Sequence, residues 1–155
     1  RCALGNGKLV CSGHAFAADF CGDEWRSRLQ VSDAPLYSPE EAGRRLASKG
    51  QRHSLVLFDH WPSDVVGHRG TMDQAVDLVG RIDAVLGGIM DEWHLDEGLV
   101  IITSDHGNLE DMSTRNHTLN RVPTILIGRG HAGLADRIHD LTDLAPVITR
   151  YLADM

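Results

Sequence analysis

The sequence predicts an α/β domain with a mostly parallel sheet and helices packed on it. Three short apolar runs, at residues 54–59, 99–104 and 124–128, have the β-forming composition of buried strands. Between the first two, apolar residues recur at helical spacing over about residues 72–93, which predicts a long helix that faces the core. A strand, a helix and a second strand in this order form a βαβ unit, whose strands are parallel and whose crossover is right-handed.

Capping boxes mark the starts of two helices. Ser38 is followed by a proline and, three residues after the cap, by Glu41, so a helix is predicted to run to about Ser48. Thr71 and Gln74 repeat this pattern at the start of the long helix.

Two glycines interrupt the long helix near its end. Gly87 and Gly88 each weaken it by about 1 kcal/mol relative to alanine, and we expect them to mark a close approach to the sheet. A last helix is predicted to begin near Thr142. The first part of the chain has no sustained period, so residues 1–37 are predicted to be an irregular segment of the same domain, with the ordered α/β part over 38–155.

Composition and charge narrow the possible partners. The 155 residues are 42% hydrophobic and 24% charged, which is typical of one globular domain. A formal net charge of −7 with scattered lysines and arginines argues against a nucleic-acid partner. No apolar stretch approaches the roughly 20 residues of a membrane span, and no secretory leader is recognisable. We therefore expect no membrane partner and a cytoplasmic protein.

The N-terminal part holds all three cysteines, Cys2, Cys11 and Cys21. Because their number is odd, reduced thiols are expected rather than a disulfide framework. The chain starts at Arg1 rather than at a methionine, which indicates a processed, proteolysed or incomplete product.

Carboxylates and imidazoles follow two of the predicted strands. Asp64 and His68 come just after the first strand, Asp105 and His106 directly follow the second, and His117 lies shortly beyond. Since ligands bind beyond the carboxyl ends of parallel strands, we expect these five side chains at one edge of the sheet. Carboxylate with imidazole suits zinc, manganese or iron, and five ligands exceed the set that one tetrahedral ion uses, which favours two metal ions.

Each of these residues also has an ordinary explanation when taken alone. Asp105 could end a strand, Asp64 could sit in a turn, and a single histidine such as His117 is more often a loop residue than a ligand. Their joint placement at one sheet edge favours the metal site. Among the other histidines, His60 is nearest, and it is expected to be packed or to face solvent.

The motifs resemble a known family in order and spacing. The runs Asp64-Val-Val-Gly-His68, Asp105-His-Gly-Asn108 and His117-Thr-Leu-Asn-Arg-Val-Pro123 are similar to the C-terminal half of cofactor-independent phosphoglycerate mutases, over about residues 38–152. These enzymes are members of the alkaline phosphatase superfamily. The resemblance implies an alkaline-phosphatase-like fold and a metal-dependent phosphoryl-transfer enzyme.

The resemblance also implies residue roles. Asp64, His68 and His117 would hold one metal ion, while Asp105 and His106 would hold the other. It implies two divalent ions, manganese or zinc, and a small phosphorylated substrate as the partner. It leaves the oligomeric state open.

Departures from the family pattern leave the catalytic and substrate-binding residues unassigned. The run from Asp59 to Asp64 replaces an asparagine-containing stretch that is typical of the family. The serine or threonine nucleophile and the inserted phosphate-transfer domain have no counterpart, so we expect an incomplete domain that is inactive in isolation. The alternatives are a phosphatase, phosphodiesterase or sulfatase of the same superfamily, a hydrolase rather than an isomerase, and a catalytically inactive metal-binding fragment.

Overall fold

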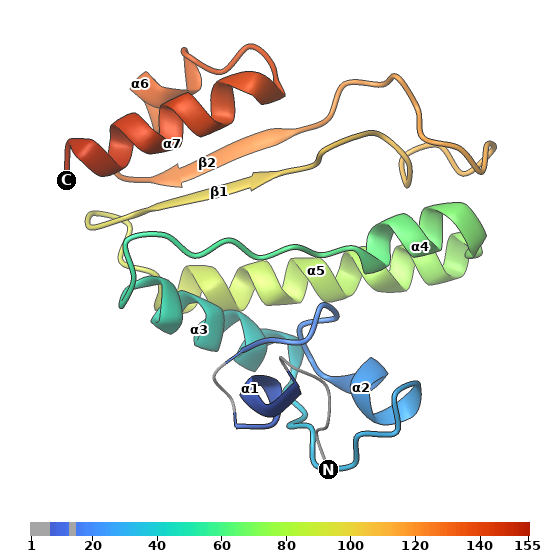
Figure 1. Ribbon diagram of the computed structural model, residues 1–155. Coiled ribbons are helices and arrows are strands. Elements are labelled where there is room, and N and C mark those ends of the chain that lie inside the picture. Colours follow the sequence, from blue (N-terminus) through green and yellow to red (C-terminus); the bar gives the residue numbers. More distant parts are fainter. Residues whose placement is uncertain (1–6, 13–14) are drawn as a thin grey trace.

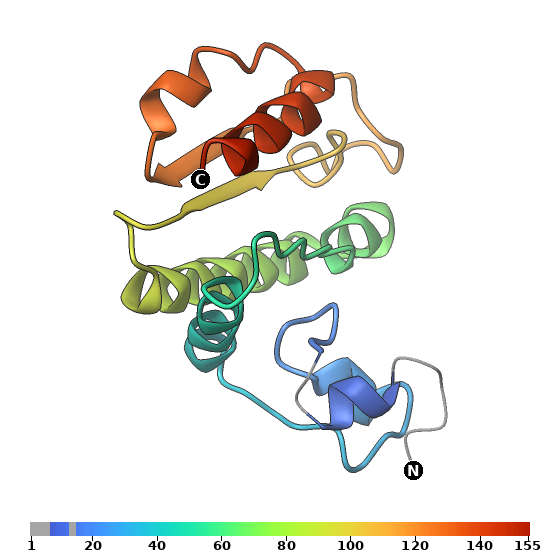
Figure 2. The same cartoon turned by 60° about the vertical axis from the view of Figure 1, so that its left-hand side comes forward.

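Helices account for most of the regular structure, and a small sheet lies among them (Figure 1). The computed structural model describes residues 7–12 and 15–155. The sheet lies between α6 and α7 on one side and α3, α4 and α5 on the other, while α1 and α2 lie beyond α3 (Figures 1 and 2). The elements are α1 (Gly7–Cys11), α2 (Asp23–Ser27), α3 (Pro39–Gly50), α4 (Pro62–Arg69), α5 (Met72–Glu92), β1 (Leu99–Thr103), β2 (Thr124–Gly128), α6 (His131–Ala135), η1 (Leu141–Asp143) and α7 (Leu144–Ala153).

Both predicted capping boxes start helices. The Ser38 hydroxyl accepts the Glu41 N–H at 3.2 Å and begins α3. At the start of α5, Thr71 accepts the Gln74 N–H at 3.3 Å, and the Gln74 side chain accepts the Thr71 N–H at 2.9 Å. These bonds satisfy amides that have no partner inside the helix, so the two predicted helices are confirmed.

The predicted C-terminal helix is also present. The Asp140 carboxylate accepts the Thr142 N–H at 2.8 Å and caps the short turn η1, which continues directly into α7. A search of the described helices for one long and apolar enough to cross a bilayer finds none.

The main core lies where α3 crosses α5. A Cβ atom at Gly88 would overlap the carbonyl group of Glu40, and one at Gly43 would overlap the carbonyl oxygen of Val85. The two helix backbones therefore touch without a side chain between them. Gly88 thus marks an approach to α3 and not, as the sequence suggested, to the sheet, and Gly87 faces open space. The buried residues around this contact are Phe20, Cys21, Ala42, Ala47, Val85 and Ile89.

The sheet differs from the predicted one. Among the described residues it has two strands, β1 and β2, which are antiparallel with Leu99 opposite Gly128 and Thr103 opposite Thr124. These residues therefore do not form the mostly parallel sheet that the sequence predicted. Parallel neighbours need a long crossover, usually a helix, whereas the 20 residues between β1 and β2 form no helix.

The first predicted strand is extended but unpaired. Residues 54–59 have no ladder partner in the described part of the chain, although Val56 and Phe58 are half-buried while Leu55 and Leu57 are exposed, which is the alternation of a strand. In both views the segment runs alongside β1 and in the same direction, as the βαβ order predicts (Figures 1 and 2). Its lack of a ladder reflects the lack of a neighbouring strand at the roughly 4.8 Å spacing that pairing needs.

The N-terminal segment packs on the helical core through Phe20, whose ring stacks on Phe58 with the centroids 4.4 Å apart. The buried Asp19 carboxylate accepts the N–H groups of Gly22 and Glu24 at 3.0 and 2.8 Å at the start of α2. Cys11 is disulfide-bonded, which corrects the expectation that all thiols are reduced. An odd number of cysteines excludes complete pairing, not one bond, and among the described residues Cys21 is a free, buried thiol.

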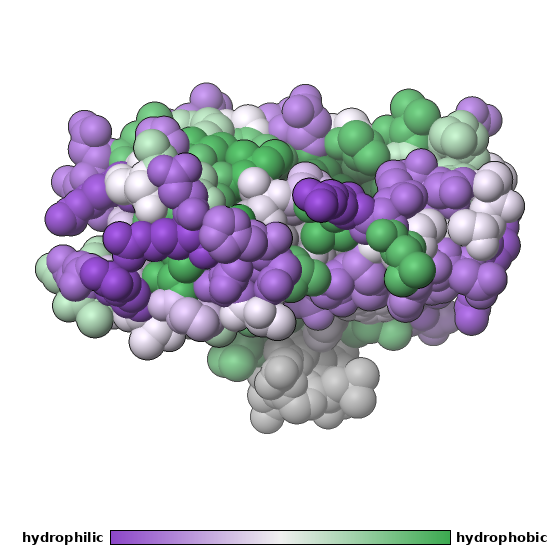
Figure 3. All heavy atoms as spheres, turned by 90° about the horizontal axis from the view of Figure 1, so that it is seen from above, coloured by the Kyte–Doolittle hydropathy of each residue, from purple (hydrophilic) through white to green (hydrophobic). Residues whose placement is uncertain are grey.

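Apolar side chains are also exposed on the surface. Seen from the side of α6 and α7, they gather in patches between hydrophilic groups (Figure 3). The large exposed apolar residues of the described chain include Leu55, Leu57, Val76, Val79 and Leu119.

The α3–α5 contact yields a prediction for two neighbouring glycines. Gly88→Ala should lower the free energy of unfolding by about 1–2 kcal/mol, because overpacking against the Glu40 backbone outweighs the gain in helix propensity. Gly87→Ala should instead raise it by up to about 1 kcal/mol, since nothing lies within 4 Å of the added methyl. Urea unfolding followed by circular dichroism measures both, and equal effects of the two changes would contradict the close contact.

Candidate metal centre

Helix α4 brings Asp64 and His68 onto one face. Its first residue is Pro62, which suits the start of a helix because proline has no N–H to satisfy there. Asp64 lies in the first turn and His68 in the last, four residues apart, so the two side chains are neighbours. The sequence analysis did not predict this helix, although Pro62 and the i, i+4 spacing were signals for it.

Three predicted ligands meet at one point. The Oδ1 atom of Asp64 lies 3.2 Å from His68 Nε2 and 3.1 Å from His117 Nε2, and the two Nε2 atoms are 3.0 Å apart. One ligand atom from each residue lies within 4.8 Å of the other two. The structure therefore brings Asp64, His68 and His117 together in a group that could hold a metal ion.

The tautomer of His68 is fixed by its second ring nitrogen. Nδ1 lies 2.5 Å from the Arg115 carbonyl oxygen, and since a carbonyl can only accept, Nδ1 carries the proton. Nε2, the other ring nitrogen, then faces the Asp64 carboxylate and the His117 ring. Metal-binding histidines are usually oriented by such a bond from the other nitrogen, so this bond orients the His68 ring as a ligand would be oriented.

Arg115 ties the loop that carries His117 to the end of α4. Its guanidinium group donates to the Gly70 carbonyl oxygen at 2.8 Å, while its own carbonyl accepts from His68. The Arg115 side chain is thus hydrogen-bonded to the backbone directly after α4.

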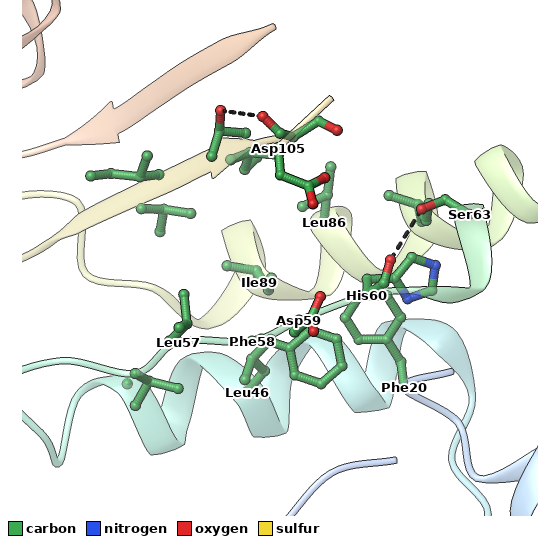
Figure 4. Close-up of a pocket in the computed structure, with 18 of the residues that line it drawn as sticks. Phe20, Leu46, Leu57, Phe58, Asp59, His60, Ser63, Leu86, Ile89 and Asp105 are labelled. Carbon is green, nitrogen blue, oxygen red and sulfur yellow. Dashed lines mark hydrogen bonds between the residues drawn. The ribbon is translucent and has the colours of Figure 1, made fainter. Parts of the chain in front are cut away.

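Asp105 and His106 follow β1 and lie beside the triad. His106 Nε2 is 3.5 Å from Asp105 Oδ2 and 3.9 Å from Asp64 Oδ1. The His106 ring stacks on His117 with the centroids 3.6 Å apart, and its buried Nδ1 has no hydrogen-bond partner within the described residues. Asp105 points into the adjoining cavity and its side chain is 85% exposed (Figure 4). The structure therefore brings all five predicted residues to one end of β1, with Asp105 and His106 outside the close triad.

Glu110 joins the loop after β1 to the loop around His117. Its carboxylate accepts the Asn108 N–H at 2.6 Å, the Thr118 hydroxyl, and the Asn120 amide at 3.0 Å. A bridge between Gly107 and Thr118 reinforces the junction. The bonds from Thr118 and then Asn120 lower the pKa of Glu110 from 4.5 to about 2. The sequence alone assigned this residue no role, because Thr118 and Asn120 become its neighbours only in the folded chain.

Gly67 allows α4 to lie against Asn108. A Cβ atom at Gly67 would overlap the Asn108 side-chain oxygen, and the Asn108 side chain is 6% exposed. Neither polar atom of that side chain has a hydrogen-bond partner within the described residues. His60 packs on the N-terminal segment, with its ring on Phe20 and its Nδ1 donating to the Ala18 carbonyl at 2.8 Å. Burial lowers the pKa of His60, so its neutral form is favoured.

The family follows from comparison with known sequences. A model of the Metalloenzyme superfamily matches residues 35–153, which include the whole cluster around Asp64. The chain belongs to the Metalloenzyme superfamily. Its sequence neighbours confirm the resemblance that the motifs indicated, and no solved structure matches the chain.

Several curated relatives within this superfamily are named 2,3-bisphosphoglycerate-independent phosphoglycerate mutase. The protein from Thiobacillus denitrificans is 34% identical over 121 residues, which cover 73% of this chain and 23% of that protein. Those from Desulforudis audaxviator and Microcystis aeruginosa are 30% and 37% identical, covering 74% and 65% of this chain and 24% and 22% of theirs. The chain therefore spans less than a quarter of the length of these relatives.

Glu110→Gln tests the junction between these two loops. The change keeps the shape but turns one accepting oxygen into an NH2 group, so the Thr118 N–H should exchange with solvent about tenfold faster or more. The effect should be largest above pH 4.5 and disappear as the pH falls through about 2, because the depressed pKa makes the junction stable only while Glu110 is ionised. Glu97→Gln, at an exposed glutamate outside the junction, is the control for NMR-detected exchange.

Proposed function

We propose that this chain is the metal-binding part of a metal-dependent phosphoryl-transfer enzyme that acts on a small phosphorylated substrate. The observation that carries the proposal is the triad of Asp64, His68 and His117, in which one possible ligand atom from each side chain lies within 4.8 Å of the other two. A carboxylate and two imidazoles held in this way suit manganese or zinc. The names of the relatives support a phosphoglycerate-mutase-like reaction.

Two metal positions fit the residues present. Asp64, His68 and His117 would hold one ion, and Asp105 and His106 would hold the second beside it. Bound divalent ions neutralise phosphoryl oxygens and make a hydroxyl group easier to deprotonate. Two ligands leave the second position open to further groups, and Asp105 at the cavity wall is accessible to them (Figure 4).

Two serines that lie next to cluster residues in the chain, Ser63 and Ser104, have other partners. Ser63 donates to the His60 carbonyl oxygen at 3.0 Å, and Ser104 donates to the His106 carbonyl oxygen at 2.8 Å. Neither is set beside the triad as a nucleophile, so the residues that attack phosphorus remain unassigned. A phosphatase, phosphodiesterase or sulfatase would use the same metal site with another nucleophile. The bonds of Ser63 and Ser104 to backbone carbonyls instead favour, as second candidate, a metal-binding part without turnover of its own.

Metal binding is the direct test. Isothermal titration of the purified chain with manganese or zinc should show binding, which His68→Ala and His117→Ala each weaken by about 100-fold, because each removes one of three converging ligands. His139→Ala, an exposed histidine outside the cluster, should leave the affinity unchanged. Equal affinities in all four proteins would contradict the site.

Turnover by this chain alone should be slow or absent. With manganese or zinc added, 3-phosphoglycerate and p-nitrophenyl phosphate should be converted at rates near those of the metal alone, because no nucleophile is positioned in line with the phosphorus. Fast conversion that His106→Ala abolishes would mean that the site is complete within these residues.

A further inference from the structure

A large cavity separates the extended segment 54–60 from β1. It has a volume of about 1520 Å³, with residues 54–60 along one side and 99–106 along the other. Leu86 and Ile89 of α5 lie at its back (Figure 4). Because no β2 residue lines it, the cavity adjoins the edge of β1 that is opposite β2.

Two unpaired backbone edges border this cavity. β1 has its only ladder, among the described residues, with β2. In the same part of the chain, no hydrogen bond joins the backbone of residues 54–59 to another segment. Native proteins pair or cover such edges, because unsatisfied N–H and C=O groups lose free energy when they leave water.

One part of the cavity lining consists of exposed apolar side chains, while charged residues such as Asp59 and Asp105 line another part. Leu57 is 90% exposed, and the other exposed large apolar side chains of the lining include Leu55, Met72, Val76 and Val79. Exposed apolar side chains gathered in this way mark a surface that a partner covers. A charged or polar occupant would leave these side chains in contact with unmatched groups.

The geometry selects an extended occupant. Residues 54–59 already alternate in burial as a strand does, and they run in the direction of β1 (Figures 1 and 2). A strand placed between two such edges gains hydrogen bonds on both sides, which is the mode of binding called β-augmentation. Strands that have neighbours on both sides and helices on their faces are apolar throughout.

We propose that this cavity receives an apolar β-strand from outside these 155 residues, which pairs with residues 54–59 on one side and with β1 on the other. The relatives have the length to supply it, since this chain accounts for 23% of the Thiobacillus denitrificans protein. A second copy of the chain fits less well as the occupant. Its two free backbone edges, residues 54–59 and β1, border the cavity of that copy, so neither edge can enter the cavity of another copy.

The test uses a strand peptide as the probe. The peptide has the sequence of Leu99–Ser104 with two lysines at each end to keep it soluble. In the chain alone, the amides of residues 55–59 should exchange rapidly with solvent. At a peptide concentration of about ten times its Kd, their exchange should slow about tenfold.

Two variants make the test specific to the cavity. Leu57→Lys should raise the Kd of the peptide about fivefold or more, since it removes an apolar cross-strand contact. Leu29→Lys is the matched control, because Leu29 is 52% exposed but lies outside the cavity lining. All samples contain EDTA, so the result is independent of metal binding and of the proposed activity.

Three outcomes would overturn the proposal. Slow exchange of residues 55–59 in the peptide-free monomer would mean that the segment pairs directly with β1. Protection that rises with protein concentration, together with a dimer mass by light scattering, would identify a second copy as the occupant. If the exchange of residues 55–59 stays unchanged up to the solubility limit of the peptide, the cavity accepts no strand.

Discussion

The backbone contact between α3 and α5 constrains most of the chain. Gly43 and Gly88 let the two helices touch without intervening side chains, so neither helix can slide without a clash. After α3, the chain runs alongside α5 and forms α4, and it then turns into α5 itself. The crossing of α3 and α5 therefore fixes both ends of this part of the chain. Asp64 and His68 take their positions from it, although neither residue takes part in the contact.

Local signals predicted the helices well. Ser38 and Thr71 act within three residues of their own positions, so the sequence alone carries the information for these helix starts. The apolar run at 54–59 likewise predicted an extended backbone. It could not predict pairing, because a ladder depends on whichever strand lies next in space. The connection between β1 and β2 contains no helix, and this feature favours antiparallel strands. It was not used in predicting the sheet.

The five acid and imidazole residues were predictable because their types and order carry the chemistry. The structure brings them to one end of β1, and their roles as ligands rest on the proposed function. What the sequence did not reveal is how the loops are held. Arg115 and Glu110 have partners on other segments, and only the folded path makes these groups neighbours. Helix α4 was missed for a different reason, since its eight residues are few for a clear periodic pattern.

The fastening of the His117 loop by Arg115 and Glu110 has a consequence for the exchange of ions. Neither residue belongs to the triad, so the loop keeps its place by bonds that do not involve a cation. If the triad holds an ion as proposed, an arriving ion would meet side chains that are already oriented, and its affinity would not be reduced by the entropy of ordering a loop. One ion could then replace another while the domain stays folded. Which ion occupies such a site in a cell would depend on the supply of free metal and on ligand preference, and not on which ion was present when the chain folded.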